Sequence, residues 1–358
     1  MQHVAVLGWA LALVSMQPAA TDGALELRAA VWHRELVAGE PILVRLEMRN
    51  LTDRPLAVVP PYLDCDGRMS WPVDQLSVVG VGGERVASFP HAQGSARYRP
   101  MSLIGSEYNG PLGGQVFPPM ARRAWPIGPN ASITTWTDLS NYWPALAPGV
   151  YRLSLPYGPR ADMLGRERAR LVEGAVWEGV LTFDAGEITV VEADSQDRGA
   201  LEILAAVPSL PLGTPAPLSA RRAREARAEL LQRSPDSHLA PYARFYELWN
   251  HAEAVGPDAM PYGAKAADII EEADAFARDT PDFPLNYQVP LIVAVARFLR
   301  ERGVWGSRDE MARCLQERGQ PLIQAAEELG DPRLVDYALE FVHVRVEMAR
   351  KPATGRPT

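Results

Sequence analysis

The sequence predicts a two-domain protein in which a β-sandwich is followed by an α-helical domain. Up to residue 193, apolar side chains recur at every second position, which is typical of half-buried strands. Beyond residue 194 they recur at intervals of three and four, which is typical of amphipathic helices. The chain has 358 residues, and at roughly 100 to 200 residues per domain this length accommodates two domains.

The clearest strand pattern lies between Ile133 and Tyr157. Alternation from Ile133 to Asp138 is followed by the turn residues Leu146 to Gly149, and alternation resumes from Val150 to Leu155. Turn chemistry between two alternating runs predicts two neighbouring strands of one sheet. The remaining strands are expected at Leu25 to Trp32, Ile42 to Arg49, Leu56 to Val59 and Glu173 to Val191, with a hairpin from Gln75 to Phe89 that turns at Gly82 and Gly83.

One segment resembles a known domain family. The motif Asp-Leu-Ser at 138–140, Tyr142 and the strand Pro-Gly-Val-Tyr-Arg-Leu at 148–153 resemble the immunoglobulin-like domain that precedes the catalytic domain in deuterolysin-type secreted peptidases. The resemblance covers roughly Leu25 to Val191 and implies a binding or accessory domain. It carries no catalytic residue, because the six histidines of the chain never form the His-Glu-x-x-His pair of zinc ligands.

The second half of the chain has helical periodicity throughout. The segment ELLQRSPDSHLAPYARFYELW, which ends at Trp249, resembles tetratricopeptide-like repeats of bacterial envelope proteins. A second turn of this kind runs from Asp279 to Pro284, and its Pro281 lies 46 residues after Pro235 of the first turn rather than the ~34 of a regular repeat, so an irregular helical array is expected. The predicted helices are Ser195 to Val207, Arg221 to Arg233, Leu239 to Trp249, Leu285 to Arg302, Arg308 to Glu317, Pro321 to Leu329 and Pro332 to Arg350.

The amino terminus has the pattern of an export signal. The apolar run from Val4 to Met16 has 13 residues, too few to cross a bilayer, and small residues suited to a leader peptidase follow at Ala19, Ala20 and Gly23. The alternative is a short first strand or helix of a cytoplasmic protein. The expected organisation is a signal peptide (1–23), an immunoglobulin-like β-sandwich (24–193), a short helix with a proline-rich linker (194–218), a tetratricopeptide-like helical domain (219–350) and a disordered tail (351–358).

Composition narrows the classes of partner. The chain has 36 basic and 44 acidic side chains, a net charge of -8, which repels a phosphate backbone, so no nucleic-acid partner is expected. No run is long enough for a membrane span. All but two of the basic side chains are arginine, a bias that indicates a GC-rich, bacterial coding sequence. Together with the export signal, this gives a periplasmic or extracellular location as the expectation.

The sharpest charge feature lies between Asp258 and Asp282, where two basic and seven acidic side chains give a local net charge of 2 minus 7, or -5. One interpretation is a surface that binds a basic partner, including the chain's own Arg221 to Arg233 segment. The other is an ordinary solvated helix face opposite a buried apolar stripe. The candidate partner surface comprises acidic and aromatic residues, namely Asp268, Glu271, Glu272, Asp274, Tyr242, Tyr246 and Trp249.

Catalytic signatures are absent from the sequence: it contains no Gly-x-Ser-x-Gly elbow, no Walker loop and no Ser-x-x-Lys set, so neither catalysis nor a cofactor is expected. Asp64 and Asp66 flank Cys65 in a glycine turn that is either part of a calcium site or an ordinary polar turn. Cys314 is either a buried apolar side chain or a disulfide partner of Cys65. Tryptophans of the β half either form a sugar- or peptide-binding platform or fill the core.

We therefore expect an exported bacterial binding or scaffold protein whose partner is a protein or peptide. Helical arrays present extended surfaces suited to such partners. The alternative is a hydrolase or peptidase-accessory protein with a site between the two domains. Its residues would come from Asp64 and Asp66 or from the long segment Pro90 to Asn130, which is either a binding loop or a packed surface excursion. The sequence does not determine the oligomeric state.

Overall fold

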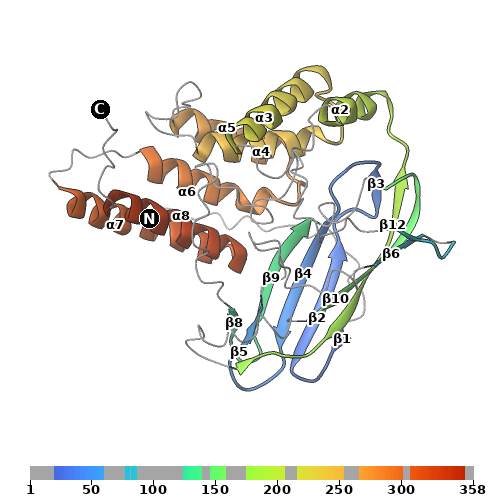
Figure 1. The fold of residues 1–358 in the computed structure, drawn as a ribbon, viewed down its shortest axis with the longest axis horizontal. Helices are drawn as coiled ribbons and strands as arrows, with labels where there is room; N and C mark the ends of the chain where they lie inside the picture. Colours follow the sequence, from blue (N-terminus) through green and yellow to red (C-terminus); the bar gives the residue numbers. More distant parts are fainter. Residues whose placement is uncertain are drawn as a thin grey trace, which may run out of the picture.

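The computed structural model describes residues 20–59, 77–80, 82–86, 124–138, 146–158, 175–205, 216–253, 266–300 and 307–350. Strands occupy the first half of the chain and helices the second, and the two sets lie in separate parts of the molecule (Figure 1). The predicted multi-domain class with both β and α parts is confirmed.

The strands form three sheets, ordered β1-β2-β4-β9, β3-β12-β10-β6-β7 and β11-β5-β8. Neighbours are antiparallel, except that β3 is parallel to β12 and β11 is parallel to β5. The strands are β1 (Ala20–Thr21), β2 (Leu25–Val31), β3 (Glu35–Val37), β4 (Leu43–Asn50), β5 (Leu56–Val58), β6 (Ser77–Gly80), β7 (Arg85–Val86), β8 (Trp125–Ile127), β9 (Ser132–Asp138), β10 (Gly149–Tyr157), β11 (Ala175–Val176) and β12 (Leu181–Val191).

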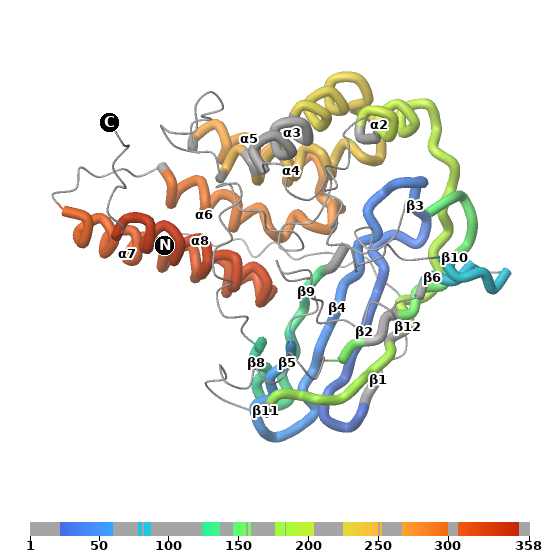
Figure 2. The backbone as a smooth tube through the Cα atoms, viewed as in Figure 1, coloured from blue at the N-terminus to red at the C-terminus, as the bar shows by residue number. Residues whose placement is uncertain are grey.

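The two larger sheets enclose one apolar core. Inward side chains from both sheets are almost fully buried, among them Leu27, Leu46, Leu153 and Ile188. Burial of such side chains provides about 1.5–3 kcal/mol each relative to exposure, which is the main reason these strands stay together. The third, small sheet lies at the end of the β half that is farthest from α2 and α4 (Figure 2).

The pairing predicted for the stretch from Ile133 to Tyr157 is wrong. Both strands exist, as β9 and β10, but they belong to different sheets: β9 pairs with β4 and β10 pairs with β12 and β6. A period of two reports which side chains share a face, but it does not identify the partner strand. The hairpin around Gly83 is confirmed: β6 pairs with β7, Gly83 has a φ of 88°, and the Gly80 N–H donates to the Glu84 carbonyl at 2.8 Å.

A buried asparagine at the end of β4 holds the β4–β5 turn against the segment between β8 and β9. Asn50 has 0% exposure, and its Nδ2 donates to the carbonyls of Arg54 (2.7 Å), Ile127 (3.1 Å) and Gly128 (3.1 Å). Its Oδ1 accepts from the N–H and the hydroxyl of Thr52. A buried amide with every hydrogen-bonding group satisfied fixes the path of the chain at this turn.

The helices form a sequential array in which each of α3 to α8 contacts the next along the chain. Prediction and structure differ at Pro321, which was expected to start a new helix but lies inside α7. Proline removes one intrahelical hydrogen bond, and the burial of Leu322 and Ala326 beyond it keeps the helix continuous. The helices are α2 (Ser195–Ala205), α3 (Ala216–Arg233), α4 (Ala240–Glu253), α5 (Ala266–Asp279), a 3-10 turn (Asn286–Gln288), α6 (Val289–Arg300), α7 (Arg308–Glu328) and α8 (Pro332–Arg350).

The β half and the helical half share buried contacts. Leu43 of β4 belongs to the helical core, and Trp32 and Trp136 pack against that core from the β side. Close approach also occurs at Gly39, which has a φ of 94° and where a Cβ atom would overlap the side chain of Leu201 in α2. Within the described residues, no helix has the length and apolar character that a membrane crossing requires.

Candidate functional site

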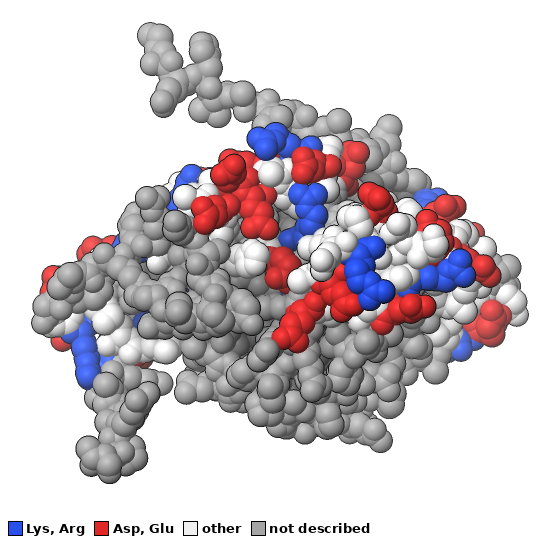
Figure 3. All heavy atoms as spheres, turned by 90° about the horizontal axis from the view of Figure 1, so that it is seen from above, with Lys and Arg blue, Asp and Glu red and all other residues white. Residues whose placement is uncertain are grey.

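The predicted acidic residues lie together on the outer face of α5. Asp268, Glu271, Glu272 and Asp274 are all exposed, whereas Ile269, Ala273 and Phe276 on the other side of α5 are at most 1% exposed. We call the four carboxylates the acidic face of α5. Of these, Glu272 lies 3.3 Å from Nδ1 of His251, and the other three form no hydrogen bond or ion pair with any described residue. Figure 3, which looks down on the molecule as seen in Figure 1, shows acidic groups beside basic ones on the upper side of the molecule.

The prediction that three aromatic residues form part of the partner surface is wrong. Tyr242, Tyr246 and Trp249 are 4%, 6% and 1% exposed, so a partner does not reach them. Tyr242 packs edge-on against Phe283, and Trp249 packs edge-on against Tyr337 of α8. Helical spacing placed these rings on one side of α4, and that side faces the interior because burying large aromatic surfaces stabilises the array.

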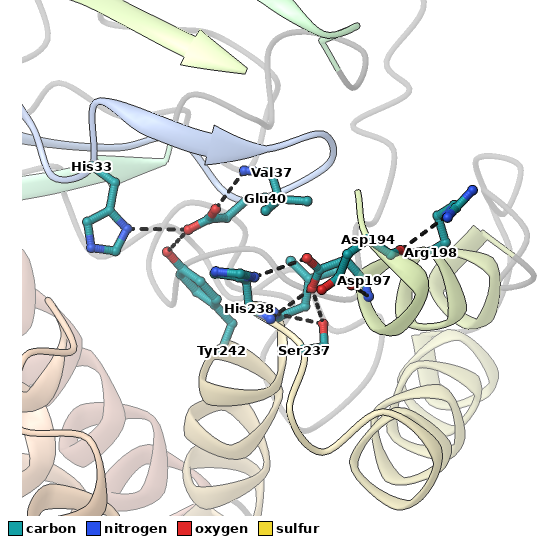
Figure 4. Close-up of polar contacts among 10 residues, drawn as sticks. His33, Val37, Glu40, Asp194, Asp197, Arg198, Ser237, His238 and Tyr242 are labelled. Carbon is teal, nitrogen blue, oxygen red and sulfur yellow. Dashed lines mark hydrogen bonds and ion pairs between the residues drawn. The ribbon is translucent and has the colours of Figure 1, made fainter. Parts of the chain in front are cut away.

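A polar cluster joins the β half to α4 and is centred on Glu40, in the turn between β3 and β4 (Figure 4). Glu40 is 6% exposed; its carboxylate accepts from the N–H of Val37 at 3.0 Å and from the hydroxyl of Tyr242 at 3.1 Å. Nδ1 of His33 lies 3.4 Å from the same carboxylate. A buried carboxylate requires such partners, so this cluster fixes the turn against the start of α4.

A second cluster joins α2 to the turn before α4 and contains a serine, a histidine and an aspartate (Figure 4). Asp197 is 1% exposed, and it accepts from the Ser237 hydroxyl at 2.8 Å and from the His238 N–H at 2.8 Å, with His238 Nδ1 3.0 Å away. The arrangement differs from a catalytic triad, in which the serine hydroxyl is bonded to the histidine. Here the Ser237 hydroxyl is hydrogen-bonded to the Asp197 carboxylate, so His238 does not activate Ser237. The cluster instead holds the turn before α4 in place.

A buried arginine attaches α8 to β9, and a neighbouring aspartate balances its charge. Arg333 is 5% exposed, and its guanidinium donates to the Trp136 carbonyl at 2.9 Å, to the Asp331 carboxylate at 3.2 Å and to the Tyr287 hydroxyl at 3.3 Å. Burial, together with the charge of Asp331, raises the pKa of Tyr287 well above its ordinary value. The phenol therefore stays protonated and donates to Asp331 at 2.8 Å.

A further hydrogen bond between the β half and the helical half lies about one turn after Arg333 along α8. The indole N–H of Trp125 in β8 donates to the carboxylate of Asp336 at 2.8 Å. Glu340 follows on the same side of the helix, and burial, reinforced by the charge of Asp336, raises the pKa of Glu340 above its ordinary value. The Trp125–Asp336 bond, the Arg333–Trp136 bond and the Glu40 cluster hold the helical array against the β half at separate points.

Several predicted site residues lie outside the described residues: Asp64, Cys65, Asp66 and most of the segment Pro90 to Asn130. Cys314 is half-buried on α7 with a free thiol in the described part of the chain. Trp125 and Trp177 are buried, which places these two tryptophans in the core rather than on a platform. Within the described ranges, no three histidine, cysteine, aspartate or glutamate side chains are grouped so that they could hold a metal ion.

The sequence pattern did not reveal the three clusters at the junction. Glu40 and Arg333 each stand next to apolar residues in the sequence, and a buried charge must find a partner. That signal marks these residues as paired, but the partners, Tyr242 and the Trp136 carbonyl, lie 202 and 197 residues away in the chain. No protein-family model matches this chain, and no curated protein matches it.

Proposed function

We propose that this chain is an exported bacterial binding or scaffold protein that acts by binding a protein or peptide partner. The observation that carries the proposal is the acidic face of α5, where exposed carboxylates stand on a helix whose other side is anchored in the core. Charge complementarity makes a basic surface the preferred partner, because steering by opposite charges raises the association rate.

An immunoglobulin-like assignment of the β half is part of this proposal. It is supported by the strand order, in which β2-β4-β9 oppose β12-β10-β6, as in the two sheets of such domains. It is also supported by Tyr151, whose hydroxyl donates to the Ala147 carbonyl at 2.8 Å, just before β10. Immunoglobulin-like domains have a tyrosine bond of this kind at the corner between their sheets. Domains of this class commonly serve as binding or accessory modules.

A tetratricopeptide-like assignment of the helical half is supported by the sequential packing of α4 to α8 and by the contact of α4 with α6 across α5. In such arrays one side commonly receives a ligand. In this chain α4 and α8 direct Tyr242, Arg333 and Asp336 toward the β half. The β half therefore covers part of that side, which leaves the outer face of α5 as the surface proposed for the partner.

The competing proposal, a hydrolase or peptidase-accessory protein with a site between the domains, has less support. Three pairs of polar side chains at or near the junction are hydrogen-bonded to one another: Ser237 to Asp197, Tyr242 to Glu40 and Arg333 to Asp331. Groups engaged in this way stabilise the junction and are not poised to attack a substrate.

The test is an affinity pull-down from the envelope fraction of the native host with three baits: the wild type, an α5 variant and an α7 control. The α5 variant is Asp268→Asn, Glu271→Gln and Asp274→Asn, and the control is Glu317→Gln, Glu327→Gln and Glu328→Gln. Both variants remove three exposed carboxylates from one helix. We expect a recurrent basic partner with the wild type and the control and at least a tenfold loss with the α5 variant. Equal recovery with all three baits contradicts the assignment of this face.

A further inference from the structure

The residues that follow the apolar leader-like run are built into the folded β half. Ala20 and Thr21 form β1, in which Ala20 lies opposite Leu27 and Thr21 lies opposite Glu26 of β2. β1 is the edge strand of its sheet, so these two residues cover part of an edge that is otherwise open on that side of β2.

Asp22, directly after β1, ties the amino terminus to Trp177, which directly follows β11. Its carboxylate accepts from the N–H groups of Ala24 and Leu25 at 3.0 Å each and from the indole N–H of Trp177 at 2.6 Å. Trp177 is 4% exposed and stacks on the buried ring of Tyr157, with the ring centroids 5.3 Å apart. Removal of Asp22 leaves the buried indole without this acceptor, which costs free energy.

The fold thus distinguishes among the three small residues at which a leader peptidase could cut. Cleavage after Gly23 removes β1 and Asp22, and cleavage after Ala20 removes half of β1. Cleavage after Ala19 keeps both. Ala19 supplies the small side chain directly before that bond, as in an A-x-A-like cleavage site, and Gln17 stands at the third position before it.

We propose that export is accompanied by hydrolysis of the Ala19–Ala20 peptide bond, so that the mature protein begins at Ala20 and its first residues form β1. Water adds across the bond, leaving a carboxylate on Ala19 and an α-amine on Ala20. This inference rests on the proposed export and moves the boundary of the leader from residue 23 to residue 19.

The test is mass spectrometry of the amino-terminal peptide of the protein purified from the native host. A peptide that begins at Ala20 supports the inference. A peptide that begins at Thr21 or Ala24 overturns the assigned bond while leaving export standing. A protein that still begins at Met1 overturns the proposed export, and with it the processing step.

A second measurement tests the physical reason for the assignment. In the protein as purified, Asp22→Ala should lower the thermal midpoint by about 3 °C or more, whereas Asp53→Ala, at an exposed turn position, should change it by less than about 1 °C. Equal midpoints for the two variants would show that the contacts of Asp22 do not contribute to the fold, and they would remove the argument for retaining it.

Discussion

The substitution Arg333→Met removes the charge that attaches α8 to β9 and leaves its partners in place. The Trp136 carbonyl loses the Arg333 donor, and among the described residues Asp331, 2% exposed, keeps only the Tyr287 hydroxyl and the backbone N–H at position 333 as donors. Removing one member of a buried ion pair costs about 3–5 kcal/mol, because the remaining charge is left uncompensated. We expect Arg333→Met to lower the free energy of unfolding by this amount.

The assay is urea denaturation followed by tryptophan fluorescence and by far-ultraviolet circular dichroism. The control is Arg350→Met, near the end of the same helix, where the side chain is 51% exposed and the change should stay within about 0.5 kcal/mol. The double variant Asp331→Asn, Arg333→Met should lose less than the sum of the single losses, because the stranded charge is also removed. A loss below about 1 kcal/mol for Arg333→Met would refute the view that the buried Arg333, through its bond to the Trp136 carbonyl, helps to hold the halves together.

Three further substitutions test other parts of the structure. Asn50→Ala should lower the free energy of unfolding by about 3 kcal/mol or more in the same denaturation assay, since it strands several buried hydrogen-bonding groups, and an effect under 1 kcal/mol would contradict that role. Gly319→Ala should lower it by about 1–3 kcal/mol despite the better helix propensity of alanine, because the new Cβ overlaps Val342, and a stabilised variant would show that α7 and α8 are less closely packed. Glu340→Gln should stabilise the protein at pH 7 by less than about 1 kcal/mol, given its partial exposure. The folded state raises the pKa of Glu340, so the native carboxyl is favourable when protonated; the advantage of glutamine should shrink as the pH falls through that pKa, and a constant difference would contradict the assignment.

The sequence predicted the kinds of element better than their partners. Alternation located β4, β9 and β10 to within a residue or two, because facing the core is a local requirement on each strand. It assigned β9 and β10 to one sheet because Leu146 to Gly149 has turn chemistry, whereas the chain crosses there between sheets, with the hydroxyl of Tyr151 bonded to Ala147. Strand partners depend on the packing of the whole domain, which no local pattern encodes.

The sequence predicted the candidate surface only in part, because which helix face is covered also depends on the packing of the whole chain. The acidic side chains of α5 are exposed as a charged helix face requires, so Asp268 and Glu271 lie where the periodicity put them. Tyr242 and Trp249 are equally periodic, but an aromatic stripe on a helix indicates only that one side is buried against something. Which neighbour covers that side, here the β half and α8, depends on contacts across the whole chain.

The most direct test of the proposed function places a photo-activatable cross-linking residue at position 271 on the acidic face of α5, and in a second protein at position 317 on α7. Both sites are exposed and both replace a glutamate. After irradiation in the native host, the account predicts one recurrent protein or peptide adduct at position 271 and none of that adduct at position 317. The same adduct at both positions, or at 317 alone, would contradict the claim that the outer face of α5 binds the partner.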